Sequence, residues 1–334
     1  IGPEPLGMST GEFEVMYLLE ATAVQAGQLR RDLERIGDSV GVVGTPDALG
    51  VGLYQVHVHT DTPRAALPHA GRARQICIHH LHPTALVTST REKVGLQTGQ
   101  GAAEVDAGLA EATSELRLIK DPWEIDQLRA AVAATKAGFD DLIRSIPRAR
   151  GHWRGERVLE GAFGAKAREE GNGLGYDTIA AAGNHANTLH WINNDGAVEP
   201  GQLVLVDAGV EVDSLYTADV TRTIPVDGRF TEAQRRIYQA VLDAADAAFA
   251  RAGTPGCRFK DVHAAAMEVI AARLEEWGML PEGVSAADSL APEGQYHRRW
   301  MVHGTSHHLG LDVHDCAQAR REMYMEAELK PGMC

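Results

Sequence analysis

Residues 203–223 read LVLVDAGVEVDSLYTADVTRT and place two carboxylates, Asp207 and Asp219, inside apolar runs that are typical of strands. The two runs meet at Asp213–Ser214, which predicts a β-hairpin with both carboxylates close together. Because an isolated carboxylate is costly to bury, each aspartate needs a cation or strong hydrogen-bond donors nearby. A single buried aspartate at a strand end is more often structural, but a converging pair indicates a site for a positively charged partner.

A second stretch, residues 301–315 with the sequence MVHGTSHHLGLDVHD, concentrates four histidines and two aspartates between glycines. Gly304 lies between His303 and His307 and argues against a helix, so the pattern is not the helical zinc motif HExxH. If one imidazole joins the two aspartates of the hairpin, the three side chains form a divalent-metal site. Such an oxygen-rich set suits Mn²⁺, Zn²⁺, Co²⁺ or Fe²⁺ better than a thiolate-preferring ion.

The composition is that of a globular chain long enough for about two domains. Its 334 residues include 46 acidic and 32 basic ones, a net charge of -14 that disfavours nucleic acid and anionic membranes as partners. The cysteines are scattered without a CxxC pair, which favours a reducing, cytoplasmic location. No signal-peptide pattern opens the chain, and a first residue other than Met indicates that the sequence starts inside a longer one.

The hydrophobic pattern divides the chain into three parts. Residues 1–90 alternate short β-like runs with one helix and are predicted to form a small α/β domain. Residues 91–107 are polar and show no apolar period, so we expect a linker there. Residues 108–334 combine long amphipathic helices with antiparallel strands, which predicts an α+β domain.

Three local signals in the third part can be compared directly with a structure. A helix is predicted to begin at Asp121, with a capping box to Glu124, and to stop at Pro147. Leu189–Trp191, with the sequence LHW, is predicted to be a strand. A later helix is predicted to begin at a capping box between Thr231 and Gln234 and to continue through Ile237, Val241, Ala245 and Phe249 to Gly253.

Together these segments resemble the Xaa-Pro aminopeptidases, the aminopeptidase P branch of the pita-bread metallopeptidases, over about residues 108–334. The resemblance is carried by ELRLIK at 115–120, LHW at 189–191, LVDAG at 205–209, ADVTRT at 218–223, HGTSH at 303–307 and LDVHD at 311–315. It implies a pita-bread α+β domain preceded by the small α/β domain. It also implies two divalent metal ions, with Mn²⁺ preferred and Zn²⁺, Co²⁺ or Fe²⁺ as alternatives.

The resemblance implies a role for each polar residue of the motifs. Asp207, Asp219 and His307 would be metal ligands, with Asp219 bridging the two ions. Substrate-facing, catalytic roles fall to His190, His303 and His314. The implied reaction is release of the N-terminal residue from Xaa-Pro peptides by attack of a metal-bridging hydroxide.

Peptides with proline at the second position are therefore the expected partners, and homo-oligomerisation is left open. Prolidase is the nearest competitor within the enzyme class. A non-catalytic peptide-binding or scaffold protein on the same fold is the alternative from a different class.

The family has two further metal ligands, both glutamates, and both would follow residue 334. Residues 329–334, LKPGMC, match the lead-in to the strand that carries the first of them. With three ligands we expect weak binding of one cation at most, because two adjacent carboxylates without enough metal repel each other. Truncation of a longer sequence is the simplest account, and a chain that kept the fold and lost the chemistry is the alternative.

Residues 11–82 resemble the middle domain of fatty-acid-kinase, dihydroxyacetone-kinase-like proteins. FEVMYLL at 13–19, GDSVGVVG at 37–44 and VHVHT at 56–60 carry this resemblance. In that family the histidines matching His57 and His59 can bind zinc with a cysteine, whose position Glu14 takes here. We therefore expect a surface-facing histidine pair and, without a kinase domain, no phosphotransfer. A junction of two families near residues 88–105 indicates a fusion or a chimeric sequence.

Overall fold

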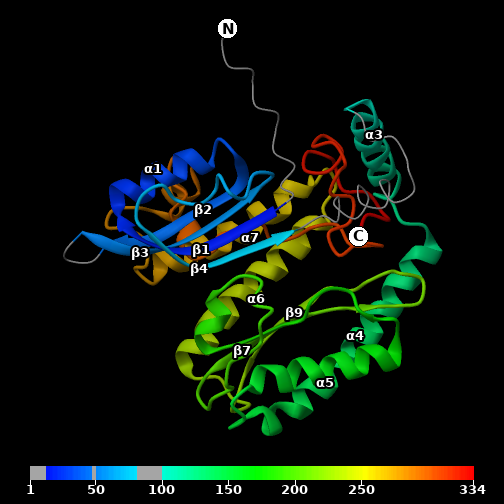
Figure 1. Cartoon of the computed structure of the whole chain (residues 1–334). Helices are drawn as coiled ribbons and strands as arrows, with labels where there is room; N and C mark the ends of the chain where they lie inside the picture. The colour runs from blue at the N-terminus through cyan, green and yellow to red at the C-terminus, as the bar shows by residue number, and fades with distance from the viewer. Residues whose placement is uncertain (1–12, 47–49, 81–99) are drawn as a thin grey trace. The chain divides into compact units, whose positions relative to one another are not determined.

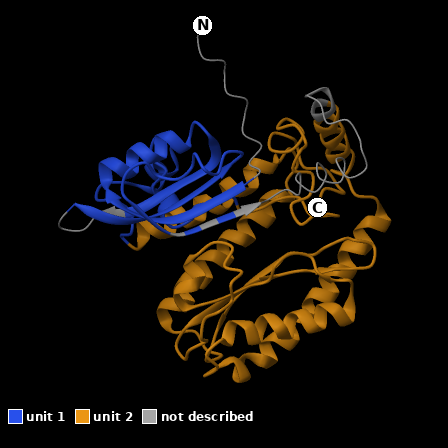
Figure 2. Cartoon of the chain, viewed as in Figure 1, with its two compact units in different colours: residues 1–104, 278–304 blue, residues 105–277, 305–334 orange. Residues whose placement is uncertain are grey.

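The computed structural model describes residues 13–46, 50–80 and 100–334 (Figure 1). Contacts divide the chain into unit 1, residues 1–104 with 278–304, and unit 2, residues 105–277 with 305–334 (Figure 2). The linker expected at 91–107 falls partly outside the described residues, and from Gln100 onward the chain is already helical. The grouping of residues 278–304 with unit 1 has no counterpart in the sequence patterns.

Unit 1 is built on an antiparallel sheet with the strand order β2-β3-β1-β4. The strands are β1 Phe13–Thr22, β2 Gly37–Pro46, β3 Val51–Thr60 and β4 Arg72–His80. Helix α1, Ala23–Leu33, begins at a capping box between Thr22 and Gln25 and packs Leu29 and Leu33 against the sheet. Helix α8, Ala286–Leu290, and the 3-10 helix η2, Tyr296–Arg299, also belong to this unit.

Unit 2 contains an antiparallel sheet with the order β6-β7-β9. Its strands are β6 Ile179–Ala182, β7 Leu203–Ala208 and β9 Val220–Pro225, and a short ladder pairs β5 Gly173–Leu174 with β8 Val210–Glu211. The helices are α3 Gln100–Leu116, α4 Pro122–Ala149, α5 Gly155–Glu170, η1 Gly183–Asn187, α6 Glu232–Ala252 and α7 Phe259–Glu276. Within the described ranges, no helix has both the length and the hydrophobicity that a membrane span requires.

Helix α4 begins as the sequence predicts and ends later. The Asp121 side chain accepts a hydrogen bond from the backbone of Glu124 at 2.9 Å, and the Glu124 side chain accepts one from the backbone of Asp121 at 2.7 Å. The predicted stop at Pro147 is wrong, because the helix continues to Ala149. The helical hydrogen bonds resume after the proline, since the backbone N–H of Arg150 reaches the carbonyl of Ile146 at 3.0 Å.

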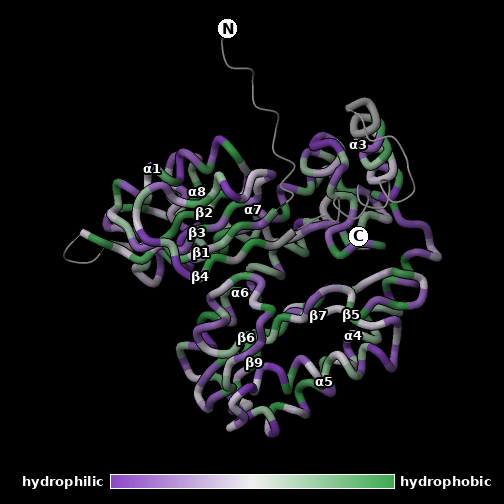
Figure 3. Tube along the Cα trace, viewed as in Figure 1, coloured by the Kyte–Doolittle hydropathy of each residue, from purple (hydrophilic) through white to green (hydrophobic). Residues whose placement is uncertain are grey.

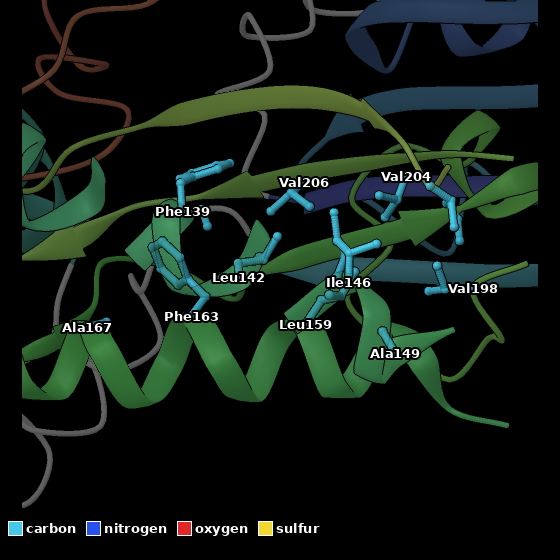
Figure 4. Close-up of a cluster of buried hydrophobic side chains, with 14 of the residues drawn as sticks. Phe139, Leu142, Ile146, Ala149, Leu159, Phe163, Ala167, Val198, Val204 and Val206 are labelled. Carbon is cyan, nitrogen blue, oxygen red and sulfur yellow. The ribbon is translucent and has the colours of Figure 1, made fainter. Parts of the chain in front are cut away.

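The main core of unit 2 lies between the α4–α5 pair and one face of the sheet (Figure 4). Phe139 on α4 and Phe163 on α5 meet edge to face, with ring centroids 5.7 Å apart. Gly138 makes this contact possible, because a Cβ there would lie 2.6 Å from the Phe163 ring. The alternating burial of β7 sends Val204 and Val206 into this core.

Helix α6 begins at the predicted capping box, and its large apolar side chains lie mostly at the surface. Ile237, Val241 and Phe249 are 48%, 55% and 84% exposed, and the hydropathy of α6 can be followed in Figure 3. The buried residues of the helix are Ala240, Ala244 and Ala248. Alanines at a spacing of four form a flat stripe, and α6 packs against α7. The small side chains, and not the large ones, therefore face the neighbouring helix.

Candidate metal centre

The hairpin predicted around Asp207 and Asp219 is present. Strand β7 pairs antiparallel with β9, and Asp207 lies opposite Thr221. Because β7 alternates, Val206 and Ala208 are buried in the core while Asp207 lies on the other face of the sheet. Asp219 comes directly before β9.

Both carboxylates contact one phenolic hydroxyl. The Oη of Tyr176 lies 2.6 Å from Oδ1 of Asp207 and 2.7 Å from Oδ1 of Asp219. Gly209 keeps this approach open, since a Cβ there would lie 2.9 Å from the Tyr176 ring and 1.6 Å from the carbonyl of Ala218. A hydroxyl has a single hydrogen to donate, so two carboxylates share one donor.

The two aspartates differ electrostatically. Burial raises the pKa of Asp207 above its ordinary value, and the charge of Asp219 adds to the rise. Burial alone would also raise the pKa of Asp219, but hydrogen bonds from His307 and Tyr176 outweigh it and lower that pKa. Burial and the two carboxylates raise the pKa of Tyr176 far above its ordinary value, so Tyr176 stays protonated and donates.

His307 reaches the same carboxylates from the histidine stretch. Its Nε2 lies 2.9 Å from Oδ2 of Asp219, and its Nδ1 lies 3.0 Å from the carbonyl of His308. Burial alone would lower the pKa of His307, but these two contacts raise it. A carbonyl and a carboxylate both only accept, so both ring nitrogens of His307 donate in the imidazolium form. If a divalent cation takes the place of the Nε2 proton, the carbonyl of His308 keeps the proton at Nδ1, so two carboxylates and this imidazole fit the cation.

The other predicted site histidines are placed differently. The rings of His314 and His307 meet edge-on, with centroids 4.3 Å apart. His303 belongs to unit 1, where its Nδ1 donates to the carbonyl of Gly304 at 2.6 Å. His190 is exposed and has a left-handed backbone with φ of 49°. The approach of His303 and His190 to the carboxylates stays a prediction.

Comparison with known proteins identifies the family of the chain. Residues 126–334, more than half of the chain, match the model of metallopeptidase family M24. The chain belongs to metallopeptidase family M24. Residues 10–85 match a second model, that of the FakA-like middle domain of fatty acid kinase.

Relatives of this M24 chain carry aminopeptidase names. Xaa-Pro aminopeptidase 2 of Streptomyces coelicolor is 52% identical over 231 residues, which cover 69% of this chain and 48% of the relative. Xaa-Pro aminopeptidase 1 of the same organism is 48% identical over 236 residues, 71% of this chain and 47% of the relative. The chain thus spans about half the length of the curated relatives it matches.

Solved structures confirm the pita-bread α+β fold. Aminopeptidase PepP of Pseudomonas aeruginosa is 33% identical, with a TM-score of 0.58 over 66% of this chain and 48% of that one. Zinc-substituted Escherichia coli aminopeptidase P in complex with product is 33% identical, with a TM-score of 0.58 over 67% of this chain and 48% of that one.

The LHW segment at 189–191, in unit 2, does not form the predicted strand. It belongs to the loop between η1 and β7, and the φ of His190 is incompatible with a strand. The loop is held by Glu156 on α5, a residue that is fully buried. The Glu156 carboxylate accepts four hydrogen bonds, from Ala182 N, His185 Nδ1, Trp191 Nε1 and Gly196 N, at 2.7, 2.8, 3.0 and 2.7 Å.

Sequence reasoning overlooked both Glu156 and Tyr176. Glu156 lies in the first turn of an amphipathic helix, where acidic residues are common for reasons of the helix dipole. Tyr176 precedes the buried strand β6 and has no sequence neighbour that sets it apart from a core aromatic residue. Only their contacts in the folded chain distinguish them.

Among the described residues, two clusters bring three possible ligand atoms within 4.8 Å of one another, and neither is the set Asp207, Asp219 and His307. One contains Glu156, His185 and the exposed Asp195, but both Glu156 oxygens already accept hydrogen bonds. We therefore assign this cluster a structural role. The other cluster lies in unit 1 and contains Glu14, His57 and His59.

The expectation of a surface-facing pair is wrong for His57, which is 5% exposed. Strand pairing places Glu14 opposite His59 and next to His57 on the same face. The His57 Nε2 lies 2.9 Å from Oε1 of Glu14, and its Nδ1 lies 2.9 Å from the carbonyl of Ser39. Because the buried carboxylate and imidazole satisfy each other, both can leave water.

Proposed function

We propose that the chain carries the active site of a metal-dependent aminopeptidase that releases the N-terminal residue from Xaa-Pro peptides. The observation that carries the proposal is that Asp207 and Asp219 share the hydroxyl of Tyr176 and that His307 contacts Asp219. The third of these proposed ligands is 88 residues from the second in sequence. Membership of family M24 supports a metallopeptidase, and the names of the relatives support the Xaa-Pro substrate.

The proposed ligands are Asp207, Asp219 and His307, and the preferred ion is Mn²⁺. When bound, two divalent cations supply a hydroxide at neutral pH and polarise the scissile carbonyl. The protein orients its ligands with hydrogen bonds, since Tyr176 donates to the carboxylates and the carbonyl of His308 holds Nδ1–H of His307.

We further propose that His314 is a substrate-facing histidine. Its ring stands edge-on against His307, so it lies beside a proposed ligand without replacing it. An imidazole at this place would donate to the oxyanion that forms when the carbonyl is attacked. His190 and His303 are proposed for the same function.

The ligand set is tested by titrating the chain with Mn²⁺ in a calorimeter. We expect Asp219→Asn to abolish the binding, because it removes the carboxylate that faces both Tyr176 and His307. Asp213→Asn is the matched control, since Asp213 is exposed in the turn of the same hairpin. Equal binding by the wild type and Asp219→Asn would contradict the proposed ligands.

The reaction is tested by incubating a version of the chain extended past Cys334, together with Mn²⁺, with an Xaa-Pro tripeptide and with the matching Xaa-Ala tripeptide. Release of the first residue only ahead of proline is the expected result. Preference for an Xaa-Pro dipeptide over the tripeptide would favour prolidase. Binding of the peptide with no release in any Mn²⁺-loaded form would favour the non-catalytic alternative and end the enzyme proposal.

A further inference from the structure

Two of the three proposed site histidines of the 301–315 stretch, His307 and His314, lie at the ends of one short loop. Its base is an isolated antiparallel bridge between His308 and Asp315, in which the Asp315 N–H donates to the carbonyl of His308 at 2.9 Å. His307 precedes one bridged residue and His314 precedes the other. Each imidazole therefore lies one residue before a bridged position, and the two ring centroids are 4.3 Å apart.

A buried ion pair holds this bridge. The Lys120 Nζ lies 2.7 Å from Oδ2 of Asp315, and both side chains are 1% exposed. The ammonium also donates to the carbonyl of Arg117 at 2.7 Å. A second cation joins the pair, since Nη2 of Arg117 lies 3.2 Å from Oδ1 of Asp315. Lys120 stands between α3 and α4, so the pair connects the helical layer to the loop.

Gly310 leaves room for the ion pair, and its carbonyl links the loop to the hairpin that carries the carboxylates. A Cβ at Gly310 would lie 2.3 Å from Oδ2 of Asp315 and 3.0 Å from Cε of Lys120. The carbonyl of Gly310 accepts from the N–H of Thr217 at 3.1 Å, two residues before Asp219. The loop is thus tied at one point to the ion pair and at another to the hairpin that carries the proposed ligands.

A buried ion pair is a weak source of stability, because desolvation offsets most of the attraction and an apolar pair of similar volume often does as well. Its directional bonds, in contrast, fix a position. We propose that Lys120 and Asp315 are positioning residues that set His307 and His314 against the carboxylates. The importance of that position for catalysis rests on the proposed function. The positioning itself is tested with neither metal nor peptide.

The first arm of the test separates stability from position. Lys120→Met and Asp315→Leu each leave a buried partner charge, and we expect the melting temperature of unit 2 to fall by roughly 10 °C. The double variant, with an apolar pair, should recover most of that loss. Lys136→Met and Asp140→Leu on the exposed face of α4 are the matched control pair and should change little.

The second arm measures the histidines in the whole chain, labelled with ¹⁵N-histidine. Proton contacts between the rings of His307 and His314, assigned with His314→Gln, report their spacing. We expect these contacts to be lost in the stable double variant and kept in the control pair. If the double variant melts like the wild type and keeps the contacts, the pair is merely structural and the proposal is wrong.

Gly310→Ala provides a variant that retains both charges. The added methyl group would displace Asp315, so the same ring contacts should weaken although the ion pair is chemically intact. Unchanged contacts in a folded Gly310→Ala chain would also overturn the proposal. Failure of metal binding or cleavage with intact ring contacts would count against the proposed function alone.

Discussion

Replacing Glu156 with glutamine should loosen the loop between η1 and β7, which contains His190, without creating a cavity. The two carboxylate oxygens each accept two hydrogen bonds from the loop and its ends, and an amide has only one oxygen. Whichever way the amide turns, two N–H donors lose their acceptor and face an NH₂ group. An unsatisfied buried donor costs about 1–3 kcal/mol, so two donors give a loss of about 2–6 kcal/mol.

For Glu156→Gln we expect a loss of stability in the lower half of this range. The His185 side chain is 35% exposed, and water can replace its lost partner. Ala182 shares one carboxylate oxygen with His185, and Trp191 shares the other with Gly196, so in either orientation of the amide one of these two less accessible N–H groups bears most of the cost. We expect a loss of about 3 kcal/mol in the free energy of unfolding, measured as the urea midpoint at constant m value.

Glu160→Gln, one turn later on α5, is the control for Glu156→Gln. The fluorescence of Trp191, isolated by comparison with Trp191→Phe, should shift in Glu156→Gln because its indole N–H loses a carboxylate partner. A loss below about 1 kcal/mol with an unchanged Trp191 signal would refute the assignment of Glu156 as the anchor of the loop.

Three further predictions concern burial. Phe163→Ala should cost about 3–5 kcal/mol in urea unfolding, because the ring is fully buried against Phe139. Thr135→Val should cost about 1–3 kcal/mol by the same measurement, since it leaves the N–H of Val210 without its 2.9 Å acceptor. Burial raises the pKa of Cys316 to about 12, so at pH 8 its thiol is protonated, and iodoacetamide should alkylate exposed Cys334 first, with Cys316 reacting only after unfolding.

Unit 1 contains a buried cluster that only part of its sequence pattern explains. The imidazole of His57 is the partner of the buried Glu14 carboxylate. The strand register alone places the two side chains on one face. Their burial depends on the rest of the unit, and the sequence pattern of alternating residues carries no information on it.

Several features of the chain follow from short-range patterns. The capping boxes at Asp121 and Thr231 satisfy the first N–H groups of their helices within three residues, so sequence predicts both helix starts. The alternation of residues 203–208 predicts β7 and places Asp207 on the face opposite the core. The motifs around Asp207, Asp219 and His307 also predict the family, because they are local in sequence.

The tertiary structure decided what depends on partners far apart in sequence. The buried face of α6 is its alanine stripe, because small side chains allow close packing on α7. The hydrophobicity of Ile237 or Phe249 does not show which face of the helix is buried. Tyr176 and Lys120 become distinct only through contacts with residues 31 to 195 positions away, and Glu156 only through its complete burial among loop donors. Burial and hydrogen bonding are properties of the folded chain, and they decide what these side chains do.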